Sequence, residues 1–163
     1  MDSFFSQLKQ KLFQRLFSCK RVKASMVPLT LIFFQLLITF GLVILIWVIQ
    51  ILHYPSFIFY KEQNFSSAMK FHQLRITLIT LPLMITELAL SAFIFYKSQN
   101  IFSTFSLILV GLIWISTFFI QVPLHEKLLK KMEPIIISRL VKTNWIRTVL
   151  WTLKLIVLGW QAY

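Results

Sequence analysis

The sequence predicts an all-α integral membrane protein, in which a four-transmembrane-helix bundle is preceded by an amphipathic interfacial helix. Hydrophobic residues make up 58% of the chain and charged residues only 13%, far below the roughly 25% charged residues of soluble domains. Four apolar runs approach the roughly 20 residues that a spanning helix needs; they cover residues 29–52, 76–96, 101–122 and, less continuously, 145–160. Continuous runs without alternation favour helices over the strands of a barrel.

The first 25 residues differ from a cleavable signal peptide, because Lys9, Lys11 and Arg15 interrupt their apolar positions. Phenylalanine and leucine residues recur there at helical spacing and share one face. The segment 1–25 is therefore predicted to be a helix lying in the membrane interface. It is either an anchor or lipid sensor, or an amphipathic lead-in to the first span.

The remaining residues, 26–163, form one predicted transmembrane domain. Its spans cover about residues 28–53, 67–97, 101–122 with an extension to 131, and 135–161. Pro28 opens the first helix, where a missing N–H costs nothing, and Pro55 is predicted to end it. The connection at residues 97–100 is so short that the second and third helices must be antiparallel neighbours.

Charge suggests an orientation and a lipid environment. The basic residues between Lys9 and Lys23 place the amino terminus in the cytoplasm by the positive-inside rule, as in a multi-pass protein of the bacterial inner membrane. The loop at residues 123–142 is also basic and would then face outward, which the rule disfavours. The net charge of +12 suits anionic headgroups, and no nucleic-acid recognition module accompanies it.

All three histidines, His53, His72 and His125, fall just beyond the ends of apolar runs that share one side of the membrane. Together they could bind a transition metal such as copper, iron or zinc, or two of them could hold a haem. Their spacing includes no pair three or four residues apart, and Cys19 is the single cysteine. The alternative is a set of interfacial histidines that bond one another, backbone and water.

Glu87 is the one acid within any of the apolar runs, and an ionisable group at that depth indicates a functional site. Lys154 lies at a similar depth in the fourth run, so a buried Glu87–Lys154 pair is the simplest arrangement that tolerates both. Alternatively, Glu87 stays protonated and carries protons, while Lys154 extends to the inner surface.

Asn144, Arg147, Trp151 and Lys154 follow one another at spacings of 3, 4 and 3, and so share one face of the fourth helix. If that face points inward, the planar fork of Arg147 could bind an anionic group, with Asn144 beside it. The alternative is an interfacial arginine whose head extends to the membrane surface.

Several short motifs resemble those of small four-helix bacterial membrane proteins related to the anthrone oxygenase-like family. They are QVPLH at residues 121–125 followed by NWIRT at 144–148, LHYP at 52–55, and PLMITE at 82–87. His125 stands where the better-known branch of that family has asparagine. The resemblance covers about residues 29–160 and implies a four-helix membrane fold and the oxygenation of an aromatic polyketide-like substrate.

Two classes of function follow from these residues. The first is a membrane-embedded oxidoreductase or oxygenase for a small hydrophobic substrate, with a site at the outer mouth of the bundle. His53, His72 and His125 would bind its cofactor, and Glu87, Arg147 and Asn144 would be catalytic. The second is a non-enzymatic protein that holds a lipid, quinone, haem or partner helix in the same cavity. Either could form a homo-oligomer.

Overall fold

A computed structural model of the chain describes residues 27–162, so the predicted interfacial helix at residues 1–25 lies outside the described part. Within residues 27–162 all regular secondary structure is helical, without strands. The elements are α2 (Leu29–Val48), η1 (Ile49–His53), α3 (Tyr54–Ser56), η2 (Phe57–Phe59), α4 (Glu62–Ser98), α5 (Ile101–Ser116), η3 (Thr117–Gln121), α6 (Val122–Lys130) and α7 (Pro134–Ala162).

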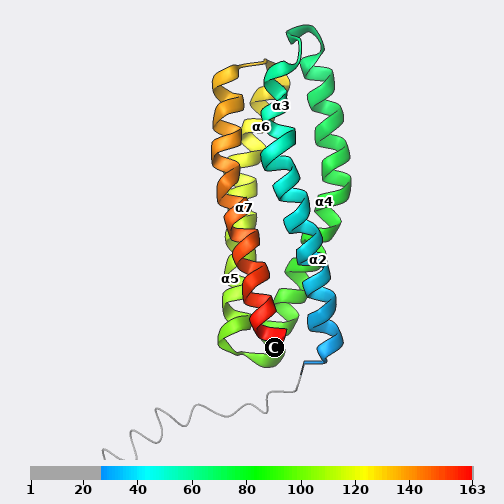
Figure 1. Cartoon of the computed structure of the whole chain (residues 1–163), viewed down its shortest axis with the longest axis vertical. Coiled ribbons are helices and arrows are strands. Elements are labelled where there is room, and N and C mark those ends of the chain that lie inside the picture. The colour runs from blue at the N-terminus through cyan, green and yellow to red at the C-terminus, as the bar shows by residue number, and fades with distance from the viewer. Residues whose placement is uncertain (1–26, 163) are drawn as a thin grey trace, which may run out of the picture.

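Four helical rods stand side by side in up-down-up-down order (Figure 1). The first rod contains α2 to η2, the second is α4, the third contains α5 to α6, and the fourth is α7. The connections before α4 and before α7 lie at the upper end, and the α4–α5 connection lies at the lower end with the end of α7. Short connections between long helices give this antiparallel order directly.

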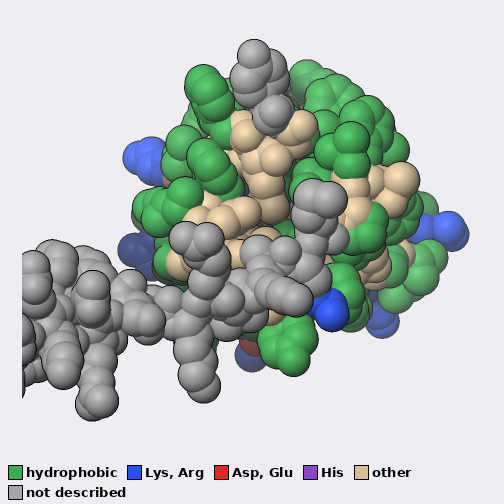
Figure 2. Space-filling model, turned by 90° about the horizontal axis from the view of Figure 1, so that it is seen from below, with side chains coloured by type: hydrophobic (Ala, Val, Ile, Leu, Met, Phe, Trp, Pro, Cys, Tyr) green, Lys and Arg blue, Asp and Glu red, His purple; other side chains and the backbone are tan. Residues whose placement is uncertain are grey.

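Three of the rods, Leu29–Phe59, Glu62–Ser98 and Ile101–Lys130, are long and apolar enough to cross a membrane. Side chains on the outside of the bundle are mostly hydrophobic, and Figure 2 shows them around the margin of the lower end. Buried polar residues on α2, α4, α5 and α7 lie in the interior instead. This distribution is the one that a lipid environment favours.

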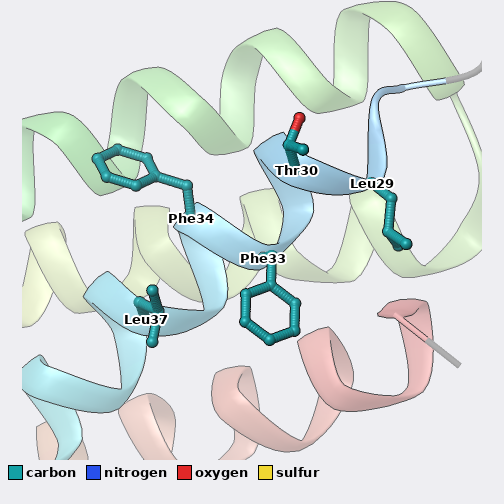
Figure 3. A pocket seen from close by; sticks show the side chains of 5 residues that line it. All are labelled: Leu29, Thr30, Phe33, Phe34 and Leu37. Carbon is teal, nitrogen blue, oxygen red and sulfur yellow. The ribbon is translucent and has the colours of Figure 1, made fainter.

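The outer face of α2 carries a shallow apolar hollow near its first residue (Figure 3). Its lining residues are Leu29, Thr30, Phe33, Phe34 and Leu37. The rings of Phe33 and Phe34 extend from different sides of the helix. No buried polar group faces this hollow, so it offers only an apolar surface.

The lower turn between α4 and α5 is fixed by local hydrogen bonds. Gln99 ends α4 in the left-handed conformation, with φ of 45°. The Asn100 side chain accepts from the Ser103 backbone N–H at 2.8 Å, and the Asn100 N–H donates to the Ser103 hydroxyl at 3.2 Å. This capping box satisfies two backbone donors at the start of α5, so the two residues Gln99 and Asn100 are enough to reverse the chain.

Pro55 does not end the first helix, contrary to the prediction, because the chain stays helical to Phe59. A proline ring inside a helix clashes with the carbonyl four residues earlier. For Pro55 and Pro123 those carbonyls belong to Ile51 and Phe119, which lie in the π-helical segments η1 and η3. The wider π turn accommodates each proline without breaking its helix.

Candidate functional site

The structure brings the three histidines together at the upper end of the bundle. His53 comes from η1, His72 from α4 and His125 from α6. The ring centroids of His53 and His72 lie 4.1 Å apart with 36° between their planes, and those of His72 and His125 lie 6.0 Å apart with 23° between their planes. The three imidazoles therefore form a row, in which His53 is tilted against His72 and His72 is stacked on His125.

This row does not support the predicted metal site on His53, His72 and His125. Among residues 27–162, no group of three or more His, Cys, Asp or Glu side chains could hold a metal ion. The lone pair of an imidazole nitrogen lies in the plane of the ring. In rings that lie face to face, these lone pairs do not converge on one point. His53 and His72, with ring centroids 4.1 Å apart, leave no room for a haem between them.

Tyr54 completes the upper cluster, and the sequence reasoning missed it. Its side chain is buried, and its hydroxyl lies 2.9 Å from Nε2 of His125. Phe57 packs edge-on against His53 and His72, with centroid distances of 5.0 and 5.4 Å. Its place next to His53 could have indicated its role, but Pro55 was interpreted as the end of the helix, so Tyr54 was not assigned to the site.

Directly below, a chain of polar side chains links α7 to the first rod. Asn144 Nδ2 donates to Gln50 Oε1 at 2.8 Å, and Arg147 Nη1 donates to Asn144 Oδ1 at 3.4 Å. Asn144 is fully buried and Arg147 is 9% exposed, whereas Ile146 and Val149 are 45% and 50% exposed. Asn144 and Arg147 therefore face the interior of the bundle.

A cavity of about 290 Å³ lies beside this chain, between α4 and the third rod. Its polar wall includes Tyr54, Gln121, His125 and Arg147, and most of the remaining wall is apolar or carries threonine. The cavity is lined by Ile49, Tyr54, Gln73, Ile76, Thr77, Thr80, Leu81, Met84, Trp114, Thr117, Phe118, Gln121, Val122, His125 and Arg147.

Four polar atoms of the lining residues are buried and have no hydrogen-bond partner within the described chain. They are Arg147 Nε, His125 Nδ1, Gln121 Oε1 and Trp114 Nε1. Buried polar atoms are nearly always hydrogen-bonded in proteins, to protein, water or ligand. Four such atoms around one cavity make it the candidate binding site.

Glu87 and Lys154 form an ion pair of 3.0 Å in which both side chains are fully buried. Lys154 Nζ also donates to Ser91 Oγ at 2.8 Å and to Ser106 Oγ at 2.6 Å. Gln35 Nε2 donates to Glu87 Oε1 at 3.0 Å. Buried ions are tolerated when such bonds surround them, so the pair ties α2, α4, α5 and α7 together.

Gln35, Ser91 and Ser106 were missed, although Ser91 follows Glu87 by four residues and must share its face. Neither Glu87 nor Lys154 lines the cavity. Glu87 instead contacts Lys154, which follows Arg147 by seven residues on α7, so it does not line the cavity with Arg147 as the predicted catalytic set of Glu87, Arg147 and Asn144 would require.

The two π segments belong to similar stretches of sequence. IQILH at residues 49–53 and IQVPLH at residues 120–125 each place a buried glutamine shortly before a histidine of the upper cluster. In both, a proline lies within five residues of the glutamine. The first and third rods thus bring similar glutamine–histidine stretches to the same site, although η1 contains its histidine and η3 ends at its glutamine.

Comparison with protein-family models, with curated proteins and with solved structures finds no match. The site is therefore interpreted from its own geometry.

Proposed function

We propose that this chain is a four-span membrane protein that binds a small hydrophobic molecule in the cavity between α4 and the third rod. Arg147 would anchor a polar atom of that molecule. The amino terminus in the cytoplasm and a bacterial inner membrane belong to the same proposal.

The proposal that α7 is the fourth span is supported by the difference between its two faces. Arg147 and Lys154 are buried, while large apolar side chains of the same helix are exposed. The exposed ones are Trp145, Ile146, Val149, Leu153, Ile156 and Trp160. A helix whose cations face inward can lie in lipid although its average composition is too polar.

The observation that carries the binding function is the unpartnered Nε of Arg147 beside the cavity. Small-molecule sites are mostly apolar, with a few polar groups that fix the orientation of the ligand. The cavity fits this description, because the apolar side chains of Ile76, Leu81 and Met84 lie opposite a polar wall.

A second candidate is an oxygenase, as the sequence resemblance implies. The bond between Tyr54 and His125 favours it, because Nδ1 of His125 is left to donate or accept a proton according to its tautomer. Turnover of an aromatic substrate with consumption of oxygen by the purified protein would support this candidate over simple binding.

The binding function can be tested by filling the cavity. Thr80 lines it, and its hydroxyl donates only to the Ile76 carbonyl of its own helix at 2.8 Å. Thr86 makes the equivalent bond to the Pro82 carbonyl at 2.9 Å but lies outside the cavity. We expect Thr80→Phe, and not Thr86→Phe, to lose any molecule that co-purifies with the protein.

The measurement is mass spectrometry of an organic extract of protein purified in mild detergent, with the thermal unfolding of both variants as a control for folding. The same compounds bound to wild-type, Thr80→Phe and Thr86→Phe protein would contradict the proposal.

A further inference from the structure

The cavity reaches the surface of the bundle on its side, between α4 and η3. Two of its lining residues, Leu81 of α4 and Phe118 of η3, are 42% and 55% exposed. Both lie well inside the continuous rods that are long enough to cross a membrane. Leu78, Ile115 and Phe119, which lie within three residues of them along the chain, are also exposed and apolar. The opening therefore lies in the part of the surface that acyl chains would cover.

Arg147 brings a charge to this cavity that no carboxylate balances within the described chain. Among residues 27–162, the ion pair present is Glu87–Lys154. The other described acids are Glu62 and Glu133, next to the upper connections, and Glu126, which is exposed on α6. A buried guanidinium is costly unless an anion or several acceptors surround it. Within residues 27–162 its polar neighbours are uncharged: the Asn144 oxygen at 3.4 Å and the Tyr54 hydroxyl.

A second unsatisfied donor beside the cavity also calls for an acceptor, whereas Gln121 Oε1 needs a donor. Trp114 Nε1 can only donate, and it is buried without a partner beside the cavity. Nε of Arg147 likewise only donates. A ligand with an ionised oxygen would accept from both kinds of donor, and charge-assisted bonds of this type are the strong ones.

On the basis of the proposed function, we infer that the ligand is a hydrophobic monoanion dissolved in the bilayer, of the long-chain carboxylic acid class. It enters sideways between Leu81 and Phe118 and seats its carboxylate on Arg147. Its chain occupies the apolar side of the cavity and extends toward the lipid.

The charge of the ligand can be tested with 16-doxylstearic acid, whose electron paramagnetic resonance spectrum broadens when protein immobilises the label. The protein is held in lipid nanodiscs, and oleate or oleyl alcohol is added as competitor. We expect oleate to displace the probe at a concentration about tenfold lower than oleyl alcohol, since one charge-assisted contact decides between them. Equal competition by the two compounds would overturn the inference.

Arg147→Gln should remove the preference for oleate over oleyl alcohol, with the unfolding temperature recorded alongside. If this variant does not fold, Thr80→Phe tests the location instead: it should abolish immobilisation of the probe in the cavity, so that neither oleate nor oleyl alcohol competes there. Retention of the preference for oleate in a folded Arg147→Gln protein would show that the acid binds elsewhere.

The side entrance is tested by narrowing it. Leu81→Trp and Phe118→Trp should slow the uptake of 16-doxylstearic acid from the bilayer, whereas Leu78→Trp and Phe119→Trp, which change exposed residues outside the cavity, should leave it unchanged. Equal uptake rates in all four variants would exclude this entrance.

These results separate the two proposals. A neutral compound that co-purifies and is lost in Thr80→Phe, together with no binding of oleate, would overturn the monoanion and leave the binding function intact. Oleate binding that is insensitive to Thr80→Phe would count against the cavity itself.

Discussion

At the scale of single residues, the bundle separates two kinds of buried charge. The ammonium of Lys154 is surrounded by Glu87, Ser91 and Ser106, so its charge is balanced and its donors are occupied. Arg147, two turns away on α7, has the Asn144 amide oxygen and the Tyr54 hydroxyl as its described neighbours, and neither carries a balancing charge. A balanced pair suits a structural role, and an unbalanced cation beside a cavity suits a ligand.

The structural role of the ion pair can be measured. Glu87→Gln leaves the buried ammonium without its counterion, so we expect the free energy of unfolding to fall by about 3–5 kcal/mol. Glu87→Leu combined with Lys154→Met should restore most of that loss, because it removes both charges together. Unfolding in detergent of Glu87→Leu, Lys154→Met and the double variant gives the coupling energy. Additive effects of the two single changes would contradict the ion pair.

At the scale of elements, hydropathy and depth along the chain predicted the helices and their ends, but they did not predict the contacts between side chains. The apolar runs predicted the rods, and counting residues along them predicted that the three histidines lie at one end. The rotation of each helix about its axis depends on packing against its neighbours, and a single sequence does not contain that information. Tyr54 and Gln35 were missed for this reason. The proline rule also failed at Pro55, because a π turn absorbed the ring.

The π turn in η3 leads to a prediction about deletions. A π turn contains one residue more than an α turn. In a Pro123→Ala background, which removes the ring that the π turn accommodates, deleting Phe119, whose side chain is exposed, should convert η3 to α-helix and keep the register of α6. Deleting Leu112, an exposed residue of the regular helix α5, should instead rotate the flanking halves by about 100° relative to each other.

We therefore expect the protein lacking Phe119 to fold and the protein lacking Leu112 to aggregate. Size-exclusion chromatography in detergent and helical circular dichroism would compare them. If both deletions were equally harmful, η3 would not be acting as a one-residue insertion.

At the scale of the whole molecule, both ends of the bundle carry basic residues, which favour the cytoplasmic side of a membrane. Basic residues precede the first rod, but the upper end is also basic, with exposed Lys61, Lys70, Lys127 and Lys130. Residues near the first span usually dominate orientation, and Lys and Arg in short loops oppose export. The histidine cluster lies on whichever side of the membrane the upper end faces, so the orientation decides which compartment it is nearest to.

Labelling of single cysteines decides the orientation. In a Cys19→Ser background, Gln63→Cys reports the upper end and Gln99→Cys the lower end, since both residues are exposed and next to connections. With the amino terminus in the cytoplasm, a membrane-impermeant maleimide should label Gln63→Cys in bacterial cells whose inner membrane is intact. Gln99→Cys should react only after that membrane is permeabilised. The reverse pattern would invert the bundle, and labelling of both cysteines from one side would contradict a second rod, α4, that spans the bilayer.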